Sequence, residues 1–277
     1  MTVKDIFVHV DAAKGNDARV EAAIGLASQH GALLTGVYVV SRPVVPAYAE
    51  VQISEDVLRA QASALRETAE KAQEEFLNVT KSKGQDSQWR CFEGIADSVL
   101  TSEARTADLL IVGQHDPDED IFPGGRDMPD HVILSSGRPV LVIPYTYKNE
   151  KIGNRILIAW DGSSRATRAV HDAMPFLKMA DQVSVMVANP AGETRIGVEP
   201  GAQITEHLKR HGVKATADHI INTNVKPGEL LLSRAADMGA DMIVCGAYGH
   251  ARWKELILGG VTDHLLDHMP VPILMSH

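Results

Sequence analysis

Short apolar runs alternate with amphipathic runs along the whole chain of 277 residues. Apolar runs of this length, bounded by polar and turn-forming residues, are typical of β-strands, and spacings of three and four residues are typical of helices. Strict alternation of the two favours parallel βαβ units and an α/β fold. Strands are expected at 5–11, 33–40, 88–92, 109–113 and 139–144, and again at 155–161, 182–189, 215–221, 242–246 and 270–275.

The second set of strands repeats the first in order and in local detail. A repeated unit has to be recognised before single motifs are weighed. We therefore predict two copies of one domain, at 1–147 and 152–277, joined by the polar stretch TYKNEKIGN (146–154). The matching pairs are DIFVHVD (5–11) with RILIAWD (155–161), ADLLIVG (107–113) with ADMIVCG (240–246), and GRPVLVIP (137–144) with MPVPILM (269–275).

The helical runs differ more than the strands. The longest expected helix, 56–77, has a counterpart around 200–212 that is shorter. Pro272 falls within the last expected strand, which favours a strand at a sheet edge because proline cannot donate a ladder hydrogen bond. One apolar stripe follows the long helix at steps of three and four residues: Leu58, Ala62, Leu65, Ala69, Ala72 and Phe76.

A glycine-spaced segment follows the fourth strand of the second copy. Gly246 and Gly249 flank a turn, and Gly259 and Gly260 precede a helix expected at 261–269. A helix N-terminus offers unpaired N–H groups that suit a phosphate, and glycine leaves them accessible. Thr262 adds a hydroxyl or caps the helix. The glycines alone are equally consistent with turns and close packing, because neither G-x-G-x-x-G nor the P-loop pattern is present.

The complete spacing, glycine, two residues, glycine, nine residues, glycine, resembles that of nucleotide-binding universal stress proteins. The resemblance covers both halves strand by strand, so the chain is similar to a tandem member of that family. It implies two doubly wound α/β domains, each a five-stranded parallel sheet in the order 3-2-1-4-5 flanked by helices. It also implies that the last strands of the two copies meet across a pseudo-two-fold within one chain, with pairing of two chains into a homodimer as a further expectation.

In ATP-binding relatives the glycine segment holds ribose and phosphates, with a divalent metal such as Mg²⁺ on the phosphates, while an Asp after strand one and the backbone ending strand two hold adenine. Gly260 stands where the family pattern has Ser or Thr. Loss of one hydroxyl hydrogen bond predicts affinity weaker by about tenfold. Without the resemblance, the preferred interpretation of Asp161 is a turn residue before a helix capped by Ser163 or Ser164; with it, adenine contact is preferred. The nucleotide-binding residues implied are Asp161, Val187, Gly246, Gly249, His250, Gly259, Gly260, Val261 and Thr262.

The first copy departs from this pattern. Asp116 stands in place of Gly249, and Pro129, which has no N–H to offer, stands in place of Gly260. The segment 116–120 carries four carboxylates that would repel phosphate. Asp11 keeps the position of Asp161. We expect the first copy to have lost triphosphate binding and to be a structural partner or to bind another ligand.

Composition narrows the class of protein. The formal charge of −9 argues against broad attraction to nucleic acid or to anionic membrane. No apolar run is long enough to span a bilayer, and Cys91 and Cys245 are expected to be buried thiols in a reducing compartment, so a cytoplasmic location is expected. His264 and His268 are spaced like two metal ligands, but no strong third ligand accompanies them, and no metal site is expected.

Three functions follow in order of preference. The first is a stress-response protein that binds ATP in its second copy and acts as a ligand-dependent regulator or sensor. The second is a scaffold or chaperone-like partner that binds no nucleotide. The third is a slow ATPase, although no nucleophile–base pair is readable and no catalytic residue is assigned.

Overall fold

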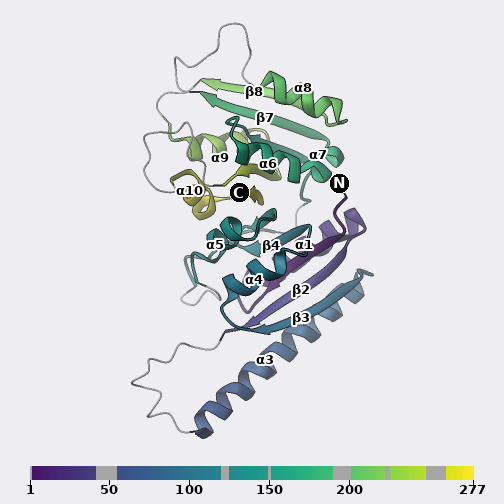
Figure 1. Cartoon of the computed structure of the whole chain (residues 1–277), viewed down its shortest axis with the longest axis vertical. Coiled ribbons are helices and arrows are strands. Elements are labelled where there is room, and N and C mark those ends of the chain that lie inside the picture. The colour runs from purple at the N-terminus through teal and green to yellow at the C-terminus, as the bar shows by residue number, and fades with distance from the viewer. Residues whose placement is uncertain are drawn as a thin grey trace.

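The computed structural model describes residues 2–41, 55–119, 125–148, 151–189, 201–221, 225–247 and 260–277. Strands and helices alternate along this part of the chain (Figure 1). The strands are β1 (Asp5–Val10), β2 (Leu33–Val40), β3 (Ser87–Glu93), β4 (Leu109–Gly113), β5 (Val140–Ile143), β6 (Arg155–Ala159), β7 (Gln182–Asn189), β8 (Ala215–Ile221), β9 (Met242–Gly246) and β10 (Ile273–Ser276). The helices are α1 (Asn16–His30), α3 (Glu55–Ser82), α4 (Ala96–Ala104), α5 (Met128–Ser135), α6 (Ser164–Asp172), α7 (Met174–Met179), α8 (Ala202–Arg210), α9 (Pro227–Asp237) and α10 (Gly260–His268).

All of these strands form one sheet in the order β3-β2-β1-β4-β5-β10-β9-β6-β7-β8. Within each half the neighbouring strands are parallel, and each half has the predicted order 3-2-1-4-5. The halves meet where β5 and β10 pair antiparallel, with Leu141 opposite Leu274. The predicted fold and the meeting of the last strands are therefore confirmed, and the two sheets are continuous.

The repeat extends to the residues that hold the strands in register. Asp108 accepts hydrogen bonds at one carboxylate oxygen from the backbone N–H groups of Lys4 and Asp5, just before β1. Asp241 accepts, at both of its carboxylate oxygens, the backbone N–H groups of residues 153–155 before β6. The Ala-Asp pair that opens each matching motif thus ties strand four to strand one in each half.

Pro272 does not lie in a strand. Strand β10 begins at Ile273, and Pro272 contributes only its carbonyl, which accepts from the Ile243 N–H at 3.0 Å. Pro139 does the same for Leu110 at 3.2 Å. The expected strand at 270–275 therefore began too early. Its expected place is confirmed, because β10 lies at the edge of the five strands of its own half, where it pairs with β5. Because proline precedes the ladder, it loses no hydrogen bond there.

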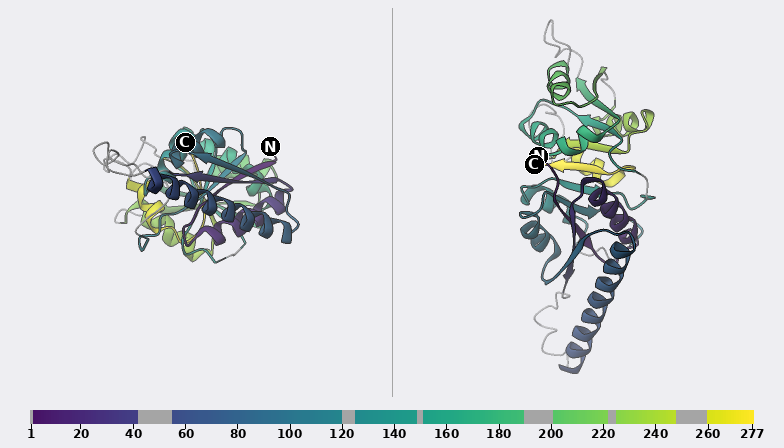
Figure 2. Two further views of the ribbon diagram at one scale, coloured as in Figure 1. Left: turned by 90° about the horizontal axis from the view of Figure 1, so that it is seen from below. Right: turned by 90° about the vertical axis from the view of Figure 1, so that its right-hand side faces the viewer.

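Helices cover both faces of the sheet, and two hydrophobic layers result (Figure 2). One layer packs α1, α6 and α7 against side chains such as Ile6, Leu141 and Leu274. The other packs α4, α5, α9 and α10 against Val142, Ile273 and their neighbours. Each layer contains residues of both halves, so the junction is part of the core. Within the described residues, no helix has both the length and the apolar character needed to cross a bilayer.

Helix α3 confirms the long amphipathic helix and extends it at both ends. Phe76, which is 2% exposed, and Trp89 lie so close to Gly36 in β2 that a Cβ there would be 2.8 Å from the Trp89 ring. Further toward the N-terminus the stripe loses its cover: Ala62 is exposed, and the helix extends beyond the sheet (Figures 1 and 2). The side chain of Leu58 lies outside the described residues.

The predicted burial of Cys91 is wrong. The residue is exposed, although it lies in strand β3 beside Phe92 and two residues after Trp89. Strand β3 is the edge strand of the N-terminal half, and α3 packs against Trp89 on one side only. Side chains alternate between the two faces of a strand, so Cys91 lies on the same face as Trp89, and its exposure follows from its place on the edge strand.

Candidate functional site

The crevice between the first and fourth strands of a doubly wound sheet is the usual ligand site, because the crossovers leave in opposite directions there. In the C-terminal half these strands are β6 and β9, paired with Ile158 opposite Val244. Asp161 follows β6 and Gly246 ends β9, so this register brings both to the carboxyl edge of the sheet. The predicted position of the two residues at one edge is thus observed.

Asp161 begins a tight turn into helix α6. One carboxylate oxygen accepts the Ser163 N–H at 2.8 Å, and Gly162 between them has φ +75°. Ser163 then caps α6 by accepting the Ala166 N–H at 3.1 Å. Asp161 is half-buried, and no ion pair to it occurs among the described residues. The turn therefore uses one oxygen and leaves the other available to a ligand, so both interpretations of this residue remain compatible.

Gly246 has a packing role. A Cβ on this residue would lie 2.6 Å from the backbone of Arg165 and Ala166, in the first turn of α6. Real Cβ atoms do not approach so closely, so only glycine lets α6 lie on the end of β9. The glycine that opens the motif is explained without a ligand, and it brings the N-terminus of α6 to the crevice.

Helix α10 begins at Gly260, with Val261 partly buried and Thr262 7% exposed. The predicted residues Gly249, His250 and Gly259 lie outside the described part of the chain. The observed helix agrees with the predicted 261–269 to within one residue at each end. Whether its N–H groups hold phosphate stays a prediction.

The backbone groups that the resemblance assigns to adenine lie at the end of strand β7. The Trp160 N–H donates to the Met186 carbonyl at 2.9 Å, so the peptide groups of Met186 face β6. Alternation turns those of Val187 toward β8, where it is opposite His219, and those of Ala188 back toward β6. Ala188 therefore joins the predicted Val187 as a backbone candidate.

Cys245 is 5% exposed, and burial raises the pKa of its thiol to about 12, with the nearby Asp161 charge adding to the rise. A thiol reacts as its thiolate, which is scarce at neutral pH when the pKa is so high. Cys245 is thus a buried thiol, as predicted, and it lies near Asp161.

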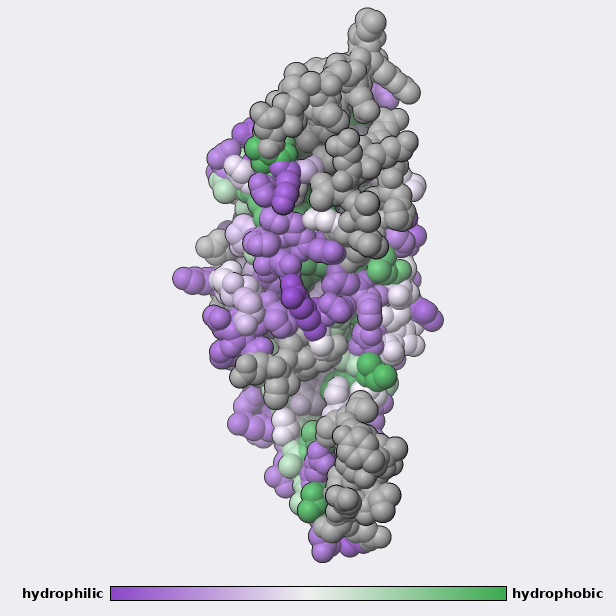
Figure 3. Space-filling model, turned by 90° about the vertical axis from the view of Figure 1, so that its left-hand side faces the viewer, coloured by the Kyte–Doolittle hydropathy of each residue, from purple (hydrophilic) through white to green (hydrophobic). Residues whose placement is uncertain are grey.

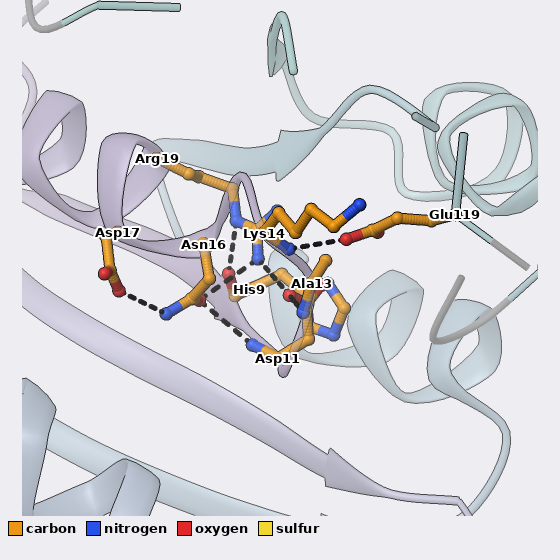
Figure 4. Close-up of polar contacts among 8 residues, drawn as sticks. All are labelled: His9, Asp11, Ala13, Lys14, Asn16, Asp17, Arg19 and Glu119. Atoms are coloured by element: carbon orange, nitrogen blue, oxygen red, sulfur yellow. Dashed lines mark hydrogen bonds and ion pairs between the residues drawn. The ribbon is translucent and has the colours of Figure 1, made fainter. Parts of the chain in front are cut away.

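The matching crevice of the N-terminal half is closed by its own side chains (Figure 4). Asp11 makes the same turn as Asp161, accepting the Ala13 N–H at 2.9 Å. Arg19, from α1, lies against it with a guanidinium nitrogen 2.7 Å from the Asp11 carboxylate, and both side chains are 2% exposed. Burial alone would raise the pKa of Asp11, but Arg19 and His9 outweigh it and hold that pKa below its ordinary value.

Two further contacts complete the closure. The Arg19 guanidinium lies over Gly113, where a Cβ would collide with it, and the Arg19 Nε donates to the His9 carbonyl at 2.7 Å. Glu119, from the acidic segment, accepts the Lys14 N–H at 2.7 Å, so this end of the segment covers the turn after β1. Pro129 lies in the first turn of α5 as expected. Asp120 lies outside the described residues.

Arg19 was not among the functional residues predicted from the sequence. Its position nevertheless carried a signal, because Arg19, Ala23 and Leu26 share the buried face of α1 at helical spacing. A cation on a buried stripe needs a buried anion, and Asp11 was the available one.

His264 and His268 do not form an open ligand pair. Their rings stack with centroids 4.4 Å apart, and Nδ1 of His268 contacts the His264 carbonyl at 3.0 Å. His264 also packs against Gly228 of α9. Among the described residues no three His, Cys, Asp or Glu side chains gather in a way that would hold a metal ion.

Together these features define a doubly wound α/β protein that contains one unit twice. The crevice of the first copy is closed by its own side chains, whereas Asp161 in the second copy has no ion pair among the described residues. The family model described as the universal stress protein family matches residues 153–277. A putative universal stress protein of Staphylococcus saprophyticus is 30% identical over 145 residues, which cover 47% of this chain and 83% of that protein. The chain belongs to the universal stress protein family.

Two other relatives span more of the chain. A universal stress protein of Synechocystis is 21% identical over 170 residues, which cover 60% of this chain and 57% of that protein. The crystal structure of a universal stress protein from Archaeoglobus fulgidus aligns with a TM-score of 0.69 at 15% identity, covering 98% of this chain and 97% of that one. The second likeness shows that the fold of the whole chain, with both halves, occurs in the family.

Proposed function

We propose that this protein binds an adenine nucleotide, ATP with Mg²⁺, in the crevice of its C-terminal half, and that occupancy regulates its contacts with other proteins in a stress response. The observation that carries the proposal is the contrast between the two equivalent aspartates. Asp11 is neutralised internally by Arg19, whereas Asp161 is half-buried with no ion pair among the described residues. An accessible carboxylate at the crevice between the first and fourth strands is suited to accept hydrogen bonds from a ligand, for example from the amino group of adenine.

The phosphates belong at the other end of the crevice. The glycine-spaced segment runs from Gly246 at the end of β9 to Gly260 at the start of α10. An α-helix leaves its first N–H groups unpaired and carries a partial positive charge there, which favours an anion. Gly260 and Val261 supply such groups without a large polar side chain. Mg²⁺ would be held mainly through the phosphates, because no metal-binding group of three side chains occurs among the described residues.

A scaffold without nucleotide is the competing function. Two observations favour it: Gly260 lacks the hydroxyl of the family pattern, and Gly246 is explained by packing against α6. Both functions use the same fold and differ only in ligand binding, so a binding measurement decides between them.

The test is calorimetric titration of nucleotide-stripped protein with ATP and Mg²⁺, with two reciprocal variants. Gly249→Asp places in the second copy the residue that the first copy has, and Asp116→Gly does the reverse. We expect one site per chain, binding abolished in Gly249→Asp, and no second site in Asp116→Gly because Arg19 still occupies Asp11. Gly260→Ser restores the family's hydroxyl and is expected to strengthen binding by about tenfold.

The variants avoid Gly246, because any side chain there displaces α6 whether or not ATP binds. Absence of both heat and thermal shift with the unmodified protein would exclude the nucleotide function and leave the scaffold. Hydrolysis above background that is lost in Gly249→Asp would establish the slow ATPase instead.

A further inference from the structure

Helix α10 is held from the other half of the molecule. The amide of Gln114, which follows β4, donates to the carbonyl of Leu266 in α10 at 2.8 Å. Gln114 is 5% exposed, and its Oε1 accepts the Tyr145 N–H at 3.2 Å, which fixes the direction of the amide. Leu266 is among the last residues of the helix, whose carbonyls have no partner within the helix. This buried bond therefore anchors the C-terminal turn of α10 to the N-terminal half.

Two arginines add contacts of the same kind. Arg126, in the N-terminal half, donates from one guanidinium nitrogen to both carboxylate oxygens of Asp267 in α10, at 3.1 and 3.2 Å. Arg168, in α6, donates to the Gly137 carbonyl before β5 at 2.6 Å. The two helices that border the proposed nucleotide site, α6 and α10, are thus both tied to the other half. Hydrophilic side chains dominate the described part of the molecular face shown in Figure 3.

The C-terminal half makes no equivalent bond to helix α5 of the N-terminal half. Gln114 and Ala247 are equivalent: the Gln114 N–H donates to the last residue of β5, Ile143, and the Ala247 N–H to the last residue of β10, Ser276. Alanine has no group with which to hold helix α5. A molecule that merely needed a symmetric junction would show the bond twice or not at all, so the asymmetry points to a division of roles.

We propose that the N-terminal half is the fixed support of the nucleotide site and that Gln114 is the residue that positions α10 for the phosphates. The proposal rests on the proposed nucleotide function. Helix α10 is about 13 Å long, and its N-terminus follows the glycine-spaced segment. Its C-terminal anchor therefore sets where the first N–H groups point. Displacements of a fraction of an ångström are enough to weaken such contacts.

The proposal predicts different effects on the binding of ATP and of adenosine. Adenosine has adenine and ribose but no phosphates, so only ATP needs the N–H groups at the N-terminus of α10. Gln114→Met removes the amide and keeps a side chain of similar length. We expect it to weaken ATP binding by about threefold to tenfold, the effect of one hydrogen bond, and to leave adenosine binding unchanged. Arg126→Gln should act in the same direction, more weakly at high salt.

Matched controls exist in the N-terminal half. Gln85 also donates its amide to a distant carbonyl, that of Ala32 at 2.8 Å, but it does not contact α10. Arg138 is an exposed arginine that donates to the Arg105 carbonyl within the same half. Gln85→Met and Arg138→Gln should therefore leave the ratio of ATP to adenosine affinity unchanged. Both binding constants would be measured by titration calorimetry in all five proteins.

Hydrogen exchange of the α10 amides supplies a readout without ligand. Faster exchange in α10 for Gln114→Met, but not for Gln85→Met, together with the selective loss of ATP affinity, supports the proposal. Equal weakening of ATP and adenosine would indicate general destabilisation and overturn it, as would unchanged exchange in α10. If the unmodified protein binds neither ligand, the proposed function fails, and the exchange experiment alone then decides whether Gln114 holds the helix.

Discussion

At the scale of single residues, the buried cluster of His9, Asp11 and Arg19 is the main difference between the two crevices. Removing charges from water is unfavourable, and the attraction between them compensates only when the geometry is good. Arg19 meets that condition through its contact with Asp11 and its bond to the His9 carbonyl. The cluster thus replaces a ligand with an internal ion pair, which holds the first crevice closed and gives it a dependence on pH.

His9 gives the first of these pH effects. It is 1% exposed, and burial lowers its pKa from 6.5 to about 4; the adjacent Asp11 opposes this shift and Arg19 adds to it. Between those two pH values the unfolded chain binds a proton at this residue that the folded chain does not, so stability falls as pH falls. We expect His9 to remove on the order of 3 kcal/mol of unfolding free energy between pH 7 and pH 4.

Urea unfolding at several pH values measures this effect. His9→Gln should flatten the curve between pH 6.5 and 4. Asp11 acts in the same direction at lower pH: its pKa is depressed, so its contribution is present above 3.8 and is lost as pH falls through the folded value. A curve for His9→Gln that parallels the unmodified protein would contradict the burial argument.

At the scale of elements, substitution of glycine by alanine is expected to have opposite effects on stability at two positions. Gly246→Ala drives a methyl group into the backbone of Arg165 and Ala166 at 2.6 Å. Overpacking of this kind destabilises by about 1–3 kcal/mol. Gly25, within α1, has no atom within 4 Å of the position that an alanine methyl group would take. Gly25→Ala is expected to stabilise by about 0.5–1 kcal/mol, because alanine loses less conformational entropy in a helix.

Thermal and urea unfolding of the two variants test this pair together. An unchanged stability of Gly246→Ala would show that α6 can move away from β9, and the close contact would then not explain the glycine. That result would return Gly246 to the role that the family pattern implies, contact with the nucleotide.

Strands were predictable from the sequence because their apolar runs are short and bounded by turn residues. The sequence did not predict the environment of side chains whose contacts are made only by the tertiary structure. Cys91 lies between Arg90 and Phe92 on the same face of the strand as Trp89, but β3 is an edge strand and Cys91 is exposed. Arg19 follows the helical pattern of α1, yet only the fold brings Asp11 to it. Gly246 was interpreted through the ligand motif, while the contact that requires glycine comes from α6.

At the scale of the molecule, the duplication and the order of strands in each half followed from the sequence, the latter through the family resemblance. The continuity of the sheet depends on one short antiparallel contact, β5 with β10. Each strand is equally apolar on both faces and its sequence indicates only a buried strand, so the meeting of the two strands was predicted through the family resemblance and not from a local pattern. The anchor from Gln114 to Leu266 was beyond sequence reasoning, because it joins residues 152 positions apart.

The last prediction concerns this junction. A chain limited to the predicted second domain, 152–277, loses β5 and exposes the edge of β10, four buried residues long. Unpaired strand edges recruit other strands. The contact between β5 and β10 is antiparallel and nearly symmetric, with Leu141 opposite Leu274, so two copies of β10 can pair in the same way about a two-fold axis. We expect this fragment to form dimers in sedimentation equilibrium.

A fragment of 1–147 added in trans supplies β5, the acceptor Gly137 and the donor Gln114, so it should replace the β10–β10 contact and yield a one-to-one complex. This exchange distinguishes a specific junction from nonspecific aggregation of an exposed edge. A folded 152–277 fragment that stays monomeric and does not bind 1–147 would show that the covalent connection, and not the strand pairing, holds the halves together. Formation of the complex would also locate the domain boundary within residues 148–151.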